Sequence, residues 1–219
     1  MTDSSGSWLS NLRGRFVVFD GIDGSGKTTQ FQRFTEFLQR CDLEVCQVRE
    51  PGGTAIGEQV RQILLDPANG DMDLLCEMLL YMASRAQLVA RQIRPALEAN
   101  RIVLADRFIS STLAYQGAAG GIPVPDILQV GRIALGPCWP DLVVIFDVEL
   151  KTALSRLSRQ LDRVERRSAE FHRAVRNGFL EQARTDPKRH LVIDANVDTD
   201  AVFDRLVIEI RDKLGEDER

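Results

Sequence analysis

The stretch Gly21-Ile22-Asp23-Gly24-Ser25-Gly26-Lys27-Thr28 decides the fold of this chain. It has the pattern G-x-x-x-x-G-K-T and follows a short apolar run directly. Glycines at these spacings let successive backbone N–H groups turn inward and bind nucleotide phosphates, and the helix that begins at the lysine adds its positive end. In such a loop Lys27 reaches the β- and γ-phosphates and the Thr28 hydroxyl ligates Mg²⁺. We therefore predict a phosphate-binding loop between a strand and a helix.

The composition indicates one compact domain. With 219 residues, of which 44% are hydrophobic, the chain can bury one sizeable core. We predict a single domain over residues 14–219 and a flexible polar tail over residues 1–13. The net charge of −4 offers no general attraction for nucleic acid or an anionic membrane surface. The four cysteines lack C-x-x-C spacing and the start of the chain lacks a signal-peptide pattern, so we expect a cytoplasmic protein with reduced thiols.

Short apolar runs alternate with longer amphipathic runs along the chain. This alternation predicts an α/β fold in which a five-stranded parallel sheet is flanked by helices on both faces. The predicted strands cover residues 16–20, 44–49, 102–106, 142–147 and 191–194. The predicted helices cover residues 27–40, 55–65, 74–99, 110–116, 125–135, 151–161, 169–184 and 200–214. Ligands of such sheets bind beyond the carboxyl ends of the strands, so the charged residues at these ends should face one crevice. They are Asp20, Arg49, Asp106, Asp147 and Asp194.

Two of these strand ends continue into polar segments. The segment Arg49-Glu50-Pro51-Gly52-Gly53-Thr54 predicts a tight loop whose backbone can approach a ligand closely, although a plain strand-to-helix connector has the same composition. At the end of another strand, Asp106 can hold Mg²⁺ while Arg107 binds an anionic group of a substrate. Asp147 is the alternative magnesium ligand, because an apolar strand that ends in Asp is the general second signature of enzymes with this loop.

Three motifs, taken in this order, resemble the thymidylate kinases of the bacterial type. They are the loop at 21–28, the segment at 49–54, and Asp106-Arg107-Phe108 continued by Ser110-Ser111-Thr112-Leu113-Ala114-Tyr115-Gln116-Gly117. Leu161-Asp162-Arg163-Val164-Glu165 is similar to the lid motif of that family. The resemblance implies a P-loop nucleoside monophosphate kinase fold with a helical lid over about residues 151–170. It also implies ATP-dependent, Mg²⁺-assisted phosphorylation of dTMP to dTDP in dTTP synthesis, and usually a homodimer.

The resemblance further implies roles for individual residues. It assigns nucleotide binding to Gly21, Ile22, Asp23, Gly24, Ser25, Gly26, Lys27, Thr28 and Thr29. It assigns dTMP binding to Asp23, Arg49, Glu50, Pro51, Tyr81, Arg85, Arg107, Ser111, Thr112, Tyr115 and Gln116. In this interpretation Tyr81 stacks on thymine, Arg85 donates to its O4, and Tyr115 disfavours ribose. Catalysis falls to Asp23, Lys27, Arg107 and Arg159, and magnesium ligation to Thr28 and Asp106.

The arginines of the lid form a separate prediction. Their spacing steps by three or four residues, which predicts a basic stripe along one helical face. They are Arg156, Arg159, Arg163, Arg166 and Arg167. The phosphate-binding loop has no positive charge before Lys27, so we expect a lid arginine to offset the charge of the transferring phosphoryl group. The resemblance favours Arg159. Because the lid is one residue shorter than usual, Arg156 and Arg163 remain alternatives, while Arg166 and Arg167 are expected to be solvated.

Two other functions are compatible with the loop alone. A different small-molecule kinase would share the loop and the acid-arginine strand end, yet is not expected to combine the Glu-Pro-Gly-Gly-Thr and Tyr-Gln-Gly motifs. A P-loop switch protein is expected to carry the guanine-binding motif N-K-x-D, which this sequence lacks. For a kinase we expect in-line attack by the acceptor phosphate without a covalent intermediate, because phosphoryl transfer mainly needs positioning and charge neutralisation.

Overall fold

A five-stranded parallel sheet forms the centre of the molecule. The structure, a computed structural model, describes residues 7–157 and 162–215. The strand order is β2-β3-β1-β4-β5, and every neighbouring pair is parallel. The strands are β1 (Phe16–Asp20), β2 (Val45–Arg49), β3 (Ile102–Asp106), β4 (Leu142–Asp147) and β5 (His190–Asp194). The predicted α/β fold and all five predicted strands are confirmed.

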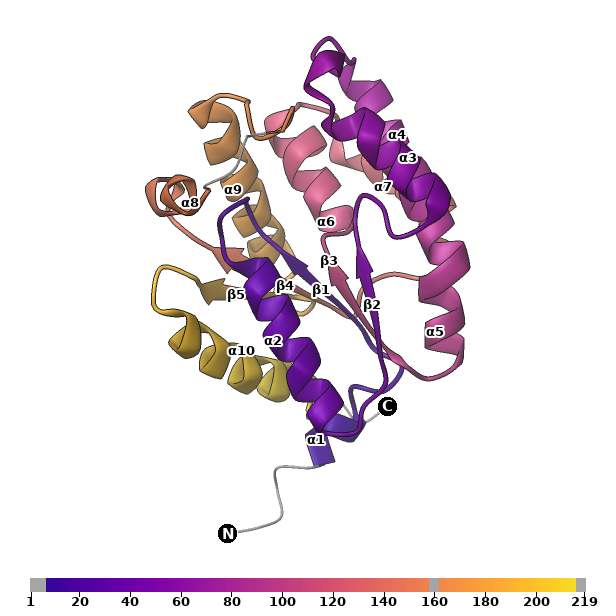
Figure 1. The fold of residues 1–219 in the computed structure, drawn as a ribbon, viewed down its shortest axis with the longest axis vertical. Helices are drawn as coiled ribbons and strands as arrows, with labels where there is room; N and C mark the ends of the chain where they lie inside the picture. Colours follow the sequence, from indigo (N-terminus) through magenta and orange to yellow (C-terminus); the bar gives the residue numbers. More distant parts are fainter. Residues whose placement is uncertain (1–6, 158–161, 216–219) are drawn as a thin grey trace.

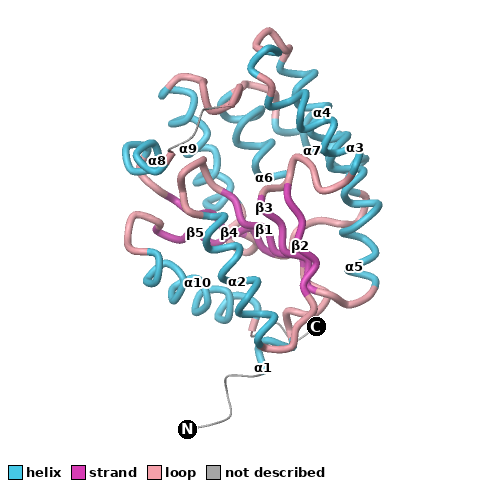
Figure 2. The backbone as a smooth tube through the Cα atoms, in the orientation of Figure 1, coloured by secondary structure: helices cyan, strands magenta, loops and turns pink. Residues whose placement is uncertain are grey.

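Helices cover both faces of this sheet (Figures 1 and 2). On one face, α2 (Lys27–Arg40) and α10 (Thr199–Leu214) pack against each other and against strands. On the other face, α5 (Arg94–Glu98) contacts β3, and α9 (Ala169–Thr185) contacts β4 and β5. All five residues of β1 are buried, because this central strand is covered on both sides. The remaining helices lie toward the carboxyl ends of the strands. They are α3 (Ala55–Leu65), α4 (Leu74–Leu88), α6 (Ile109–Thr112), α7 (Val124–Leu135) and α8 (Leu150–Arg156).

Parallel pairing brings the charged strand ends together. Phe19 of β1 and Arg49 of β2 both lie opposite Asp106 of β3, and Asp147 of β4 lies opposite Asp194 of β5. The charged strand ends therefore gather at one edge of the sheet, but none of the five lines either of the two cavities described below, so the prediction that all five face one crevice is wrong. Among residues 7–157 and 162–215, none of the helices combines the length and the apolar character that a membrane span requires.

Two predicted helices contain a π-helical turn. The run predicted over 74–99 is interrupted by η2 (Val89–Ile93), directly before Pro95 in the first turn of α5. Proline has no backbone N–H to donate and its ring clashes with the preceding turn, which a wider turn relieves. The run predicted over 110–116 continues as η3 (Leu113–Ala119), which carries Tyr115 and Gln116. A short helix η1 (Pro67–Asn69) was not predicted.

The helix predicted over residues 151–161 is confirmed as far as Arg156, but the predicted basic stripe along one helical face is wrong. The helix α8 ends at Arg156, and Leu157 has an extended backbone with φ −85° and ψ 105°. Residues 158–161, including Arg159, lie outside the described residues. Arg163 and Arg167 follow in a turn rather than on a continuation of α8, so they do not extend a helical face from Arg156.

The predicted polar tail is wrong from residue 7 onward. A short helix, α1 (Ser7–Ser10), packs against α10. Trp8 and Leu12 are buried at 6% and 1% exposure, and the ring of Trp8 stacks on Phe37 with centroids 6.3 Å apart. The Asn11 side chain donates a hydrogen bond of 2.8 Å to the carbonyl of Gly215 near the other end of the chain. Trp8, Leu9 and Leu12 have helical spacing but span little more than one turn, and Trp8 and Leu12 belong to the core.

We predict that Trp8→Ala lowers the free energy of unfolding by about 3 kcal/mol, because truncating a buried aromatic leaves a cavity. Urea unfolding at 25 °C measures this change. The matched control is Ile208→Ala on α10, where the side chain is 44% exposed, and its loss should stay below about 1 kcal/mol. Equal small losses in both variants would mean that residues before 14 contribute nothing to the core.

Candidate active site

The glycines of the loop 21–28 are required by close packing. At Gly21, where φ is 141°, a Cβ atom would lie 2.6 Å from the carbonyl oxygen of Phe146. At Gly24, where φ is 80°, it would overlap the carbonyl oxygen of Ala153 in α8. Both positions need a left-handed backbone and no side chain. The loop therefore packs closely against the end of β4 at Phe146 and against α8 at Ala153.

A groove of about 990 Å³ runs along this loop. Its wall includes Gly24 to Gln30 on one side and Ala195, Val197 and Thr199 on the other. Arg156 also lines it, and its guanidinium donates to the carbonyl oxygens of Ala195 at 3.1 Å and of Gly24 at 3.4 Å. Lys27 is buried to 7% exposure at the start of α2. Backbone N–H groups at a helix N-terminus beside a lysine form an environment suited to a polyphosphate.

One position beside the groove has suitable oxygen atoms for a magnesium ion. The Thr28 hydroxyl lies 3.1 Å from Oδ2 of Asp106. The rival carboxylate, Asp147, is bound at both oxygens by Arg176, with distances of 2.6 and 2.8 Å. Among residues 7–157 and 162–215 no cluster of three His, Cys, Asp or Glu side chains could hold a metal. Mg²⁺ is commonly held by one or two protein oxygens together with phosphates and water.

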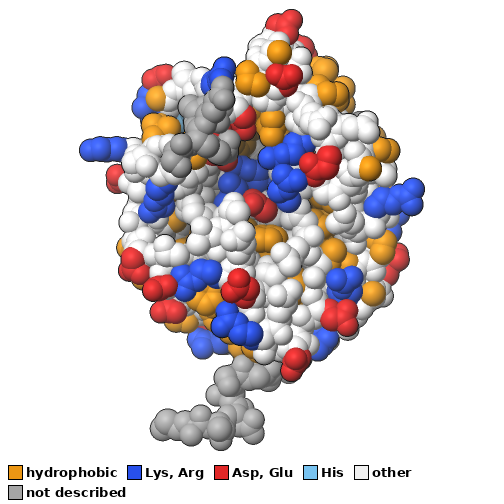
Figure 3. Space-filling model, in the orientation of Figure 1, with side chains coloured by type: hydrophobic (Ala, Val, Ile, Leu, Met, Phe, Trp, Pro, Cys, Tyr) orange, Lys and Arg blue, Asp and Glu red, His pale blue; other side chains and the backbone are white. Residues whose placement is uncertain are grey.

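A second cavity, of about 600 Å³, opens next to the groove. It brings together ten of the eleven predicted dTMP-binding residues with Arg61, Leu65, Phe108, Asp162 and Val164. The ten are Asp23, Glu50, Pro51, Tyr81, Arg85, Arg107, Ser111, Thr112, Tyr115 and Gln116. Asp23 also lines the groove. Figure 3 shows Lys and Arg side chains gathered around a hollow on this face of the molecule.

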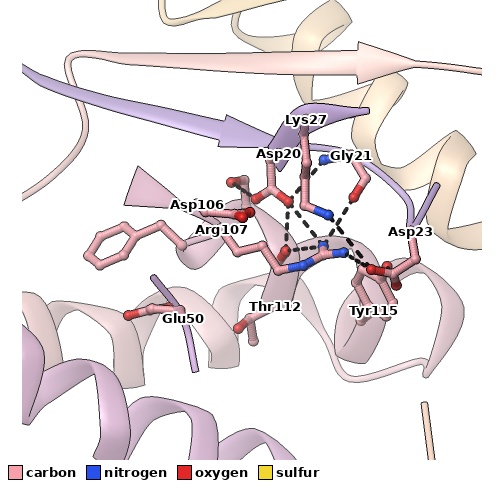
Figure 4. A network of polar contacts seen from close by, with 12 residues as sticks. Asp20, Gly21, Asp23, Lys27, Glu50, Asp106, Arg107, Thr112 and Tyr115 are labelled. Carbon is pink, nitrogen blue, oxygen red and sulfur yellow. Dashed lines mark hydrogen bonds and ion pairs between the residues drawn. The ribbon is translucent and has the colours of Figure 1, made fainter. Parts of the chain in front are cut away.

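Arg107 is the centre of the polar network at the mouth of the cavity (Figure 4). Its guanidinium donates to Oδ1 of Asp23 at 2.7 Å, to the carbonyl oxygen of Gly21 at 3.1 Å and to Oγ of Ser111 at 3.0 Å. It also lies 5.4 Å from the ring centroid of Tyr115. The backbone of Arg107 has φ 72°, a conformation that costs a residue with a side chain about 1 to 2 kcal/mol. The surrounding contacts hold the guanidinium in this place against that cost.

Asp23 is the carboxylate on which the cationic groups converge. Besides Arg107, it lies 3.7 Å from Nζ of Lys27 and accepts a hydrogen bond of 3.2 Å from the Tyr115 hydroxyl. Burial acts to raise the pKa of Asp23, but the charges of Arg107 and Lys27 and the two hydrogen bonds hold the pKa far below its usual range. Asp23 is therefore ionised at neutral pH.

The far end of the cavity is lined by a buried ion pair. Arg85 is 1% exposed, and its guanidinium lies 2.6 Å from Oε2 of Glu50. The same guanidinium donates to the carbonyl oxygen of Phe108 at 3.1 Å and to Oγ1 of Thr112 at 3.2 Å. Burial raises the pKa of Glu50 to about 7 in spite of Arg85, and the charge of Asp20 adds to the increase. The other oxygen of Glu50 is buried without a hydrogen-bond partner among the described residues.

Some predicted residues lie elsewhere. Arg49 does not line the cavity, since its guanidinium pairs with Glu58 at 2.8 Å on the surface. Arg167 was expected to be solvated, which is wrong, because it pairs with the buried Glu77 at 2.7 Å and covers the Phe171 ring. Sequence reasoning missed Arg61 in the cavity wall. A possible signal in the sequence was that Arg61 lies one helical turn after Glu58 in α3, the helix that begins directly after the segment 49–54.

Comparisons with known proteins agree with this geometry. A sequence model of the thymidylate kinase family matches residues 19–206. The chain belongs to the thymidylate kinase family. A thymidylate kinase of Symbiobacterium thermophilum is 44% identical over 199 residues, which cover 89% of this chain and 93% of that protein. One of Mycoplasma capricolum subsp. capricolum is 45% identical, with 93% and 98% covered. The crystal structure of thymidylate kinase from Ehrlichia chaffeensis superposes with a TM-score of 0.73 at 34% identity, covering 90% of this chain and 98% of that one.

The raised pKa of Glu50 predicts a pH-dependent stability. The folded chain binds this proton more tightly than the unfolded chain does, so the contribution of Glu50 to stability is greatest at low pH. It falls as the pH rises from 4.5, the ordinary pKa of a glutamate, to the folded-state pKa of about 7, by on the order of 3 kcal/mol. Urea unfolding of wild type and Glu50→Gln at pH 5 and pH 8, without nucleotide, measures the effect. The difference between the two proteins should change with pH, and a constant difference would mean that Glu50 stays ionised throughout.

Proposed function

We propose that this chain transfers the γ-phosphoryl group of ATP to dTMP and so forms dTDP for dTTP synthesis, the activity of the thymidylate kinase family. The observation that carries the proposal is the junction at Asp23, which lines both the groove of the phosphate-binding loop and the arginine-lined cavity. A donor phosphate chain in the groove and an acceptor phosphate in the cavity would meet there. Phosphoryl transfer requires this kind of juxtaposition more than it requires a nucleophilic side chain.

The charges around the junction support a role for each residue. Lys27 would bind the β- and γ-phosphates, and Arg107 would bind the acceptor phosphate. An oxygen of the dTMP phosphate attacks in line, without a covalent enzyme intermediate. Asp23 holds Arg107 at 2.7 Å and Lys27 at 3.7 Å, so it spaces the two cations around the transferring group. It would also accept a hydrogen bond from the 3′-hydroxyl of the sugar.

The inner part of the cavity suits a pyrimidine base. Tyr81 and Arg85 lie one turn apart on α4 and both line the cavity, which allows the ring to stack and the guanidinium to donate to O4 of thymine. Thr112 approaches from the end of α6, and Gln116 approaches from η3, which follows directly. Tyr115 is held by Asp23 at the sugar end and would crowd a 2′-hydroxyl.

Thr28 and Asp106 would hold Mg²⁺, through the hydroxyl and the carboxylate that now face each other at 3.1 Å. When bound, the ion neutralises phosphate charge and orients the donor. Arg176 keeps Asp147 engaged at both oxygens, which favours Asp106 for this role.

A homodimer in the cytoplasm is part of the same proposal. Large apolar side chains are exposed on neighbouring helices, with Ile56 and Ile63 on α3, Leu75 and Leu79 on α4, and Ile133 on α7. Ile133 is 83% exposed, and contiguous apolar surface of this kind is typical of subunit interfaces. Sedimentation equilibrium would give twice the mass of 24.6 kDa for a dimer.

The test of the proposed function is an ADP-release assay with ATP and one acceptor at a time. We expect kcat/KM to be highest with dTMP and lower for dUMP, dCMP, dGMP and thymidine. Lys27→Ala should remove turnover with dTMP while leaving the melting temperature close to that of wild type, because its ammonium faces the groove. A different preferred acceptor would identify another small-molecule kinase, and absence of turnover with every acceptor would favour a binding protein.

A lid arginine should supply the charge that the loop lacks. Arg156 already lines the groove, whereas Arg159 lies outside the described residues. We expect one of the two substitutions, Arg156→Ala or Arg159→Ala, to lower kcat by roughly a hundredfold with little change in KM for dTMP. The reason is that the contact of a catalytic arginine with the phosphoryl group strengthens in the transition state. Steady-state kinetics at saturating ATP measures this. Arg173→Ala is the control, since its side chain is 58% exposed and pairs with Glu170 on the surface. Two silent variants would exclude both Arg156 and Arg159 from catalysis.

A further inference from the structure

Glu77 is a buried carboxylate to which the proposed function assigns no role. It lies on α4, one turn before Tyr81, and is fully buried at 0% exposure. Its Oε1 accepts a hydrogen bond of 2.7 Å from Nε2 of Gln116. Its Oε2 accepts from Arg163 at 2.5 Å and from Arg167 at 2.7 Å. One carboxylate therefore joins a wall residue of the cavity to the segment that follows the lid.

The contact with Glu77 determines which end of the Gln116 amide faces a ligand. A carboxamide has a donor end and an acceptor end, whereas a carboxylate held between two guanidinium groups offers only acceptors. The NH₂ end of Gln116 must therefore face Glu77. Turning the amide over would place two oxygens against each other at a site where Gln116 is 2% exposed, and a buried contact of that kind is costly. The amide oxygen is the acceptor that Gln116 has left for the cavity it lines.

We propose that Glu77 is a positioning residue that sets base choice by holding the Gln116 amide with its oxygen toward the base. This inference rests on the proposed function, in which a pyrimidine occupies the cavity. Thymine carries an N–H at ring position N3 and can donate to this oxygen. Cytosine carries a lone pair at N3, which would face the oxygen without a hydrogen bond. Glu77 thus makes Gln116 select a base with an N3 donor.

The same carboxylate also anchors the segment after the lid. Arg163 donates from Nε to the carbonyl oxygen of Leu64 at 2.7 Å, and its neighbours Asp162 and Val164 line the cavity. Removing Glu77 would leave two arginines without their shared partner, and Arg163 is itself 7% exposed. A loss of activity in a simple truncation would therefore not separate anchoring from amide orientation. The test must preserve the anchor and change only the orientation.

Glu77→Gln makes this separation. The new carboxamide can keep its oxygen toward Arg163 and Arg167, and its NH₂ then faces Gln116. Gln116 has to turn over, which presents donors to the base. We expect the ratio of kcat/KM for dTMP to kcat/KM for dCMP to fall by roughly tenfold or more. The turned amide can donate to N3 of cytosine, and it can no longer accept a hydrogen bond from N3–H of thymine.

The reciprocal double variant Glu77→Gln with Gln116→Glu is the matched rescue. It keeps the number of charges in the cluster, lets the carboxamide at position 77 donate to a carboxylate at position 116, and again offers only acceptors to the cavity. We expect the dTMP to dCMP ratio to return to within about threefold of wild type. Arg167→Ala is the anchoring control, because it removes a contact to Oε2 and leaves the contact to Oε1. It should leave the ratio unchanged even where kcat falls.

Each outcome bears on the inference. A folded Glu77→Gln protein with the wild-type ratio would overturn it, and so would a lowered ratio that the double variant fails to restore, because Glu77 would then act only as an anchor. If Glu77→Gln does not fold, the double variant alone tests the inference. A folded double variant whose dTMP to dCMP ratio of kcat/KM is lowered roughly tenfold or more would then refute it. Failure of the wild-type chain to phosphorylate dTMP would instead refute the proposed function.

Discussion

The buried carboxylate of Asp20 holds together the two segments that build the site. It ends β1 at 0% exposure and accepts hydrogen bonds from the N–H of Gly21 at 3.0 Å and from the hydroxyls of Ser110 and Ser111 at 2.6 and 2.7 Å. Through these contacts the start of the phosphate-binding loop is tied to the start of α6. A buried carboxylate is stable only when such donors surround it. The relative position of groove and cavity depends on this one group.

Three buried or partly buried acid-arginine pairs then divide the site into regions. Asp23 with Arg107 lies at the junction, Glu50 with Arg85 at the inner wall, and Glu77 with Arg163 behind it. Buried ion pairs seldom increase stability over apolar packing of the same volume. Here they orient side chains. Asp23 holds Arg107, Glu50 holds Arg85 and Glu77 holds the Gln116 amide, and each of these held groups lines the cavity. The cavity can therefore present fixed donors and acceptors before a ligand arrives, which lowers the reorganisation needed on binding.

The lid region shows how tertiary contacts override a periodic pattern. Arginines at steps of three or four residues predict a helical stripe, yet α8 stops at Arg156 and Arg163 turns inward to Glu77. The buried carboxylate comes from a residue 86 positions earlier in the chain. No local pattern reveals such a partner. The same holds for Trp8, whose burial depends on Phe37 and α10 rather than on its own polar neighbourhood.

The sequence by itself determined the parallel α/β fold and the phosphate-binding loop, because these follow from local periodicity and glycine spacing, whereas the set of cavity residues followed from the resemblance to the thymidylate kinases. It also placed Tyr81 and Arg85 on one helical face, since that is a property of helix geometry. Only the tertiary structure decided that Arg49 pairs with Glu58 outside the cavity, that Asp147 is engaged by Arg176, and which end of the Gln116 amide points inward. These depend on charges that meet across long sequence separations, and a hydrogen bond or ion pair has no signature until the fold brings its two partners within about 3 Å.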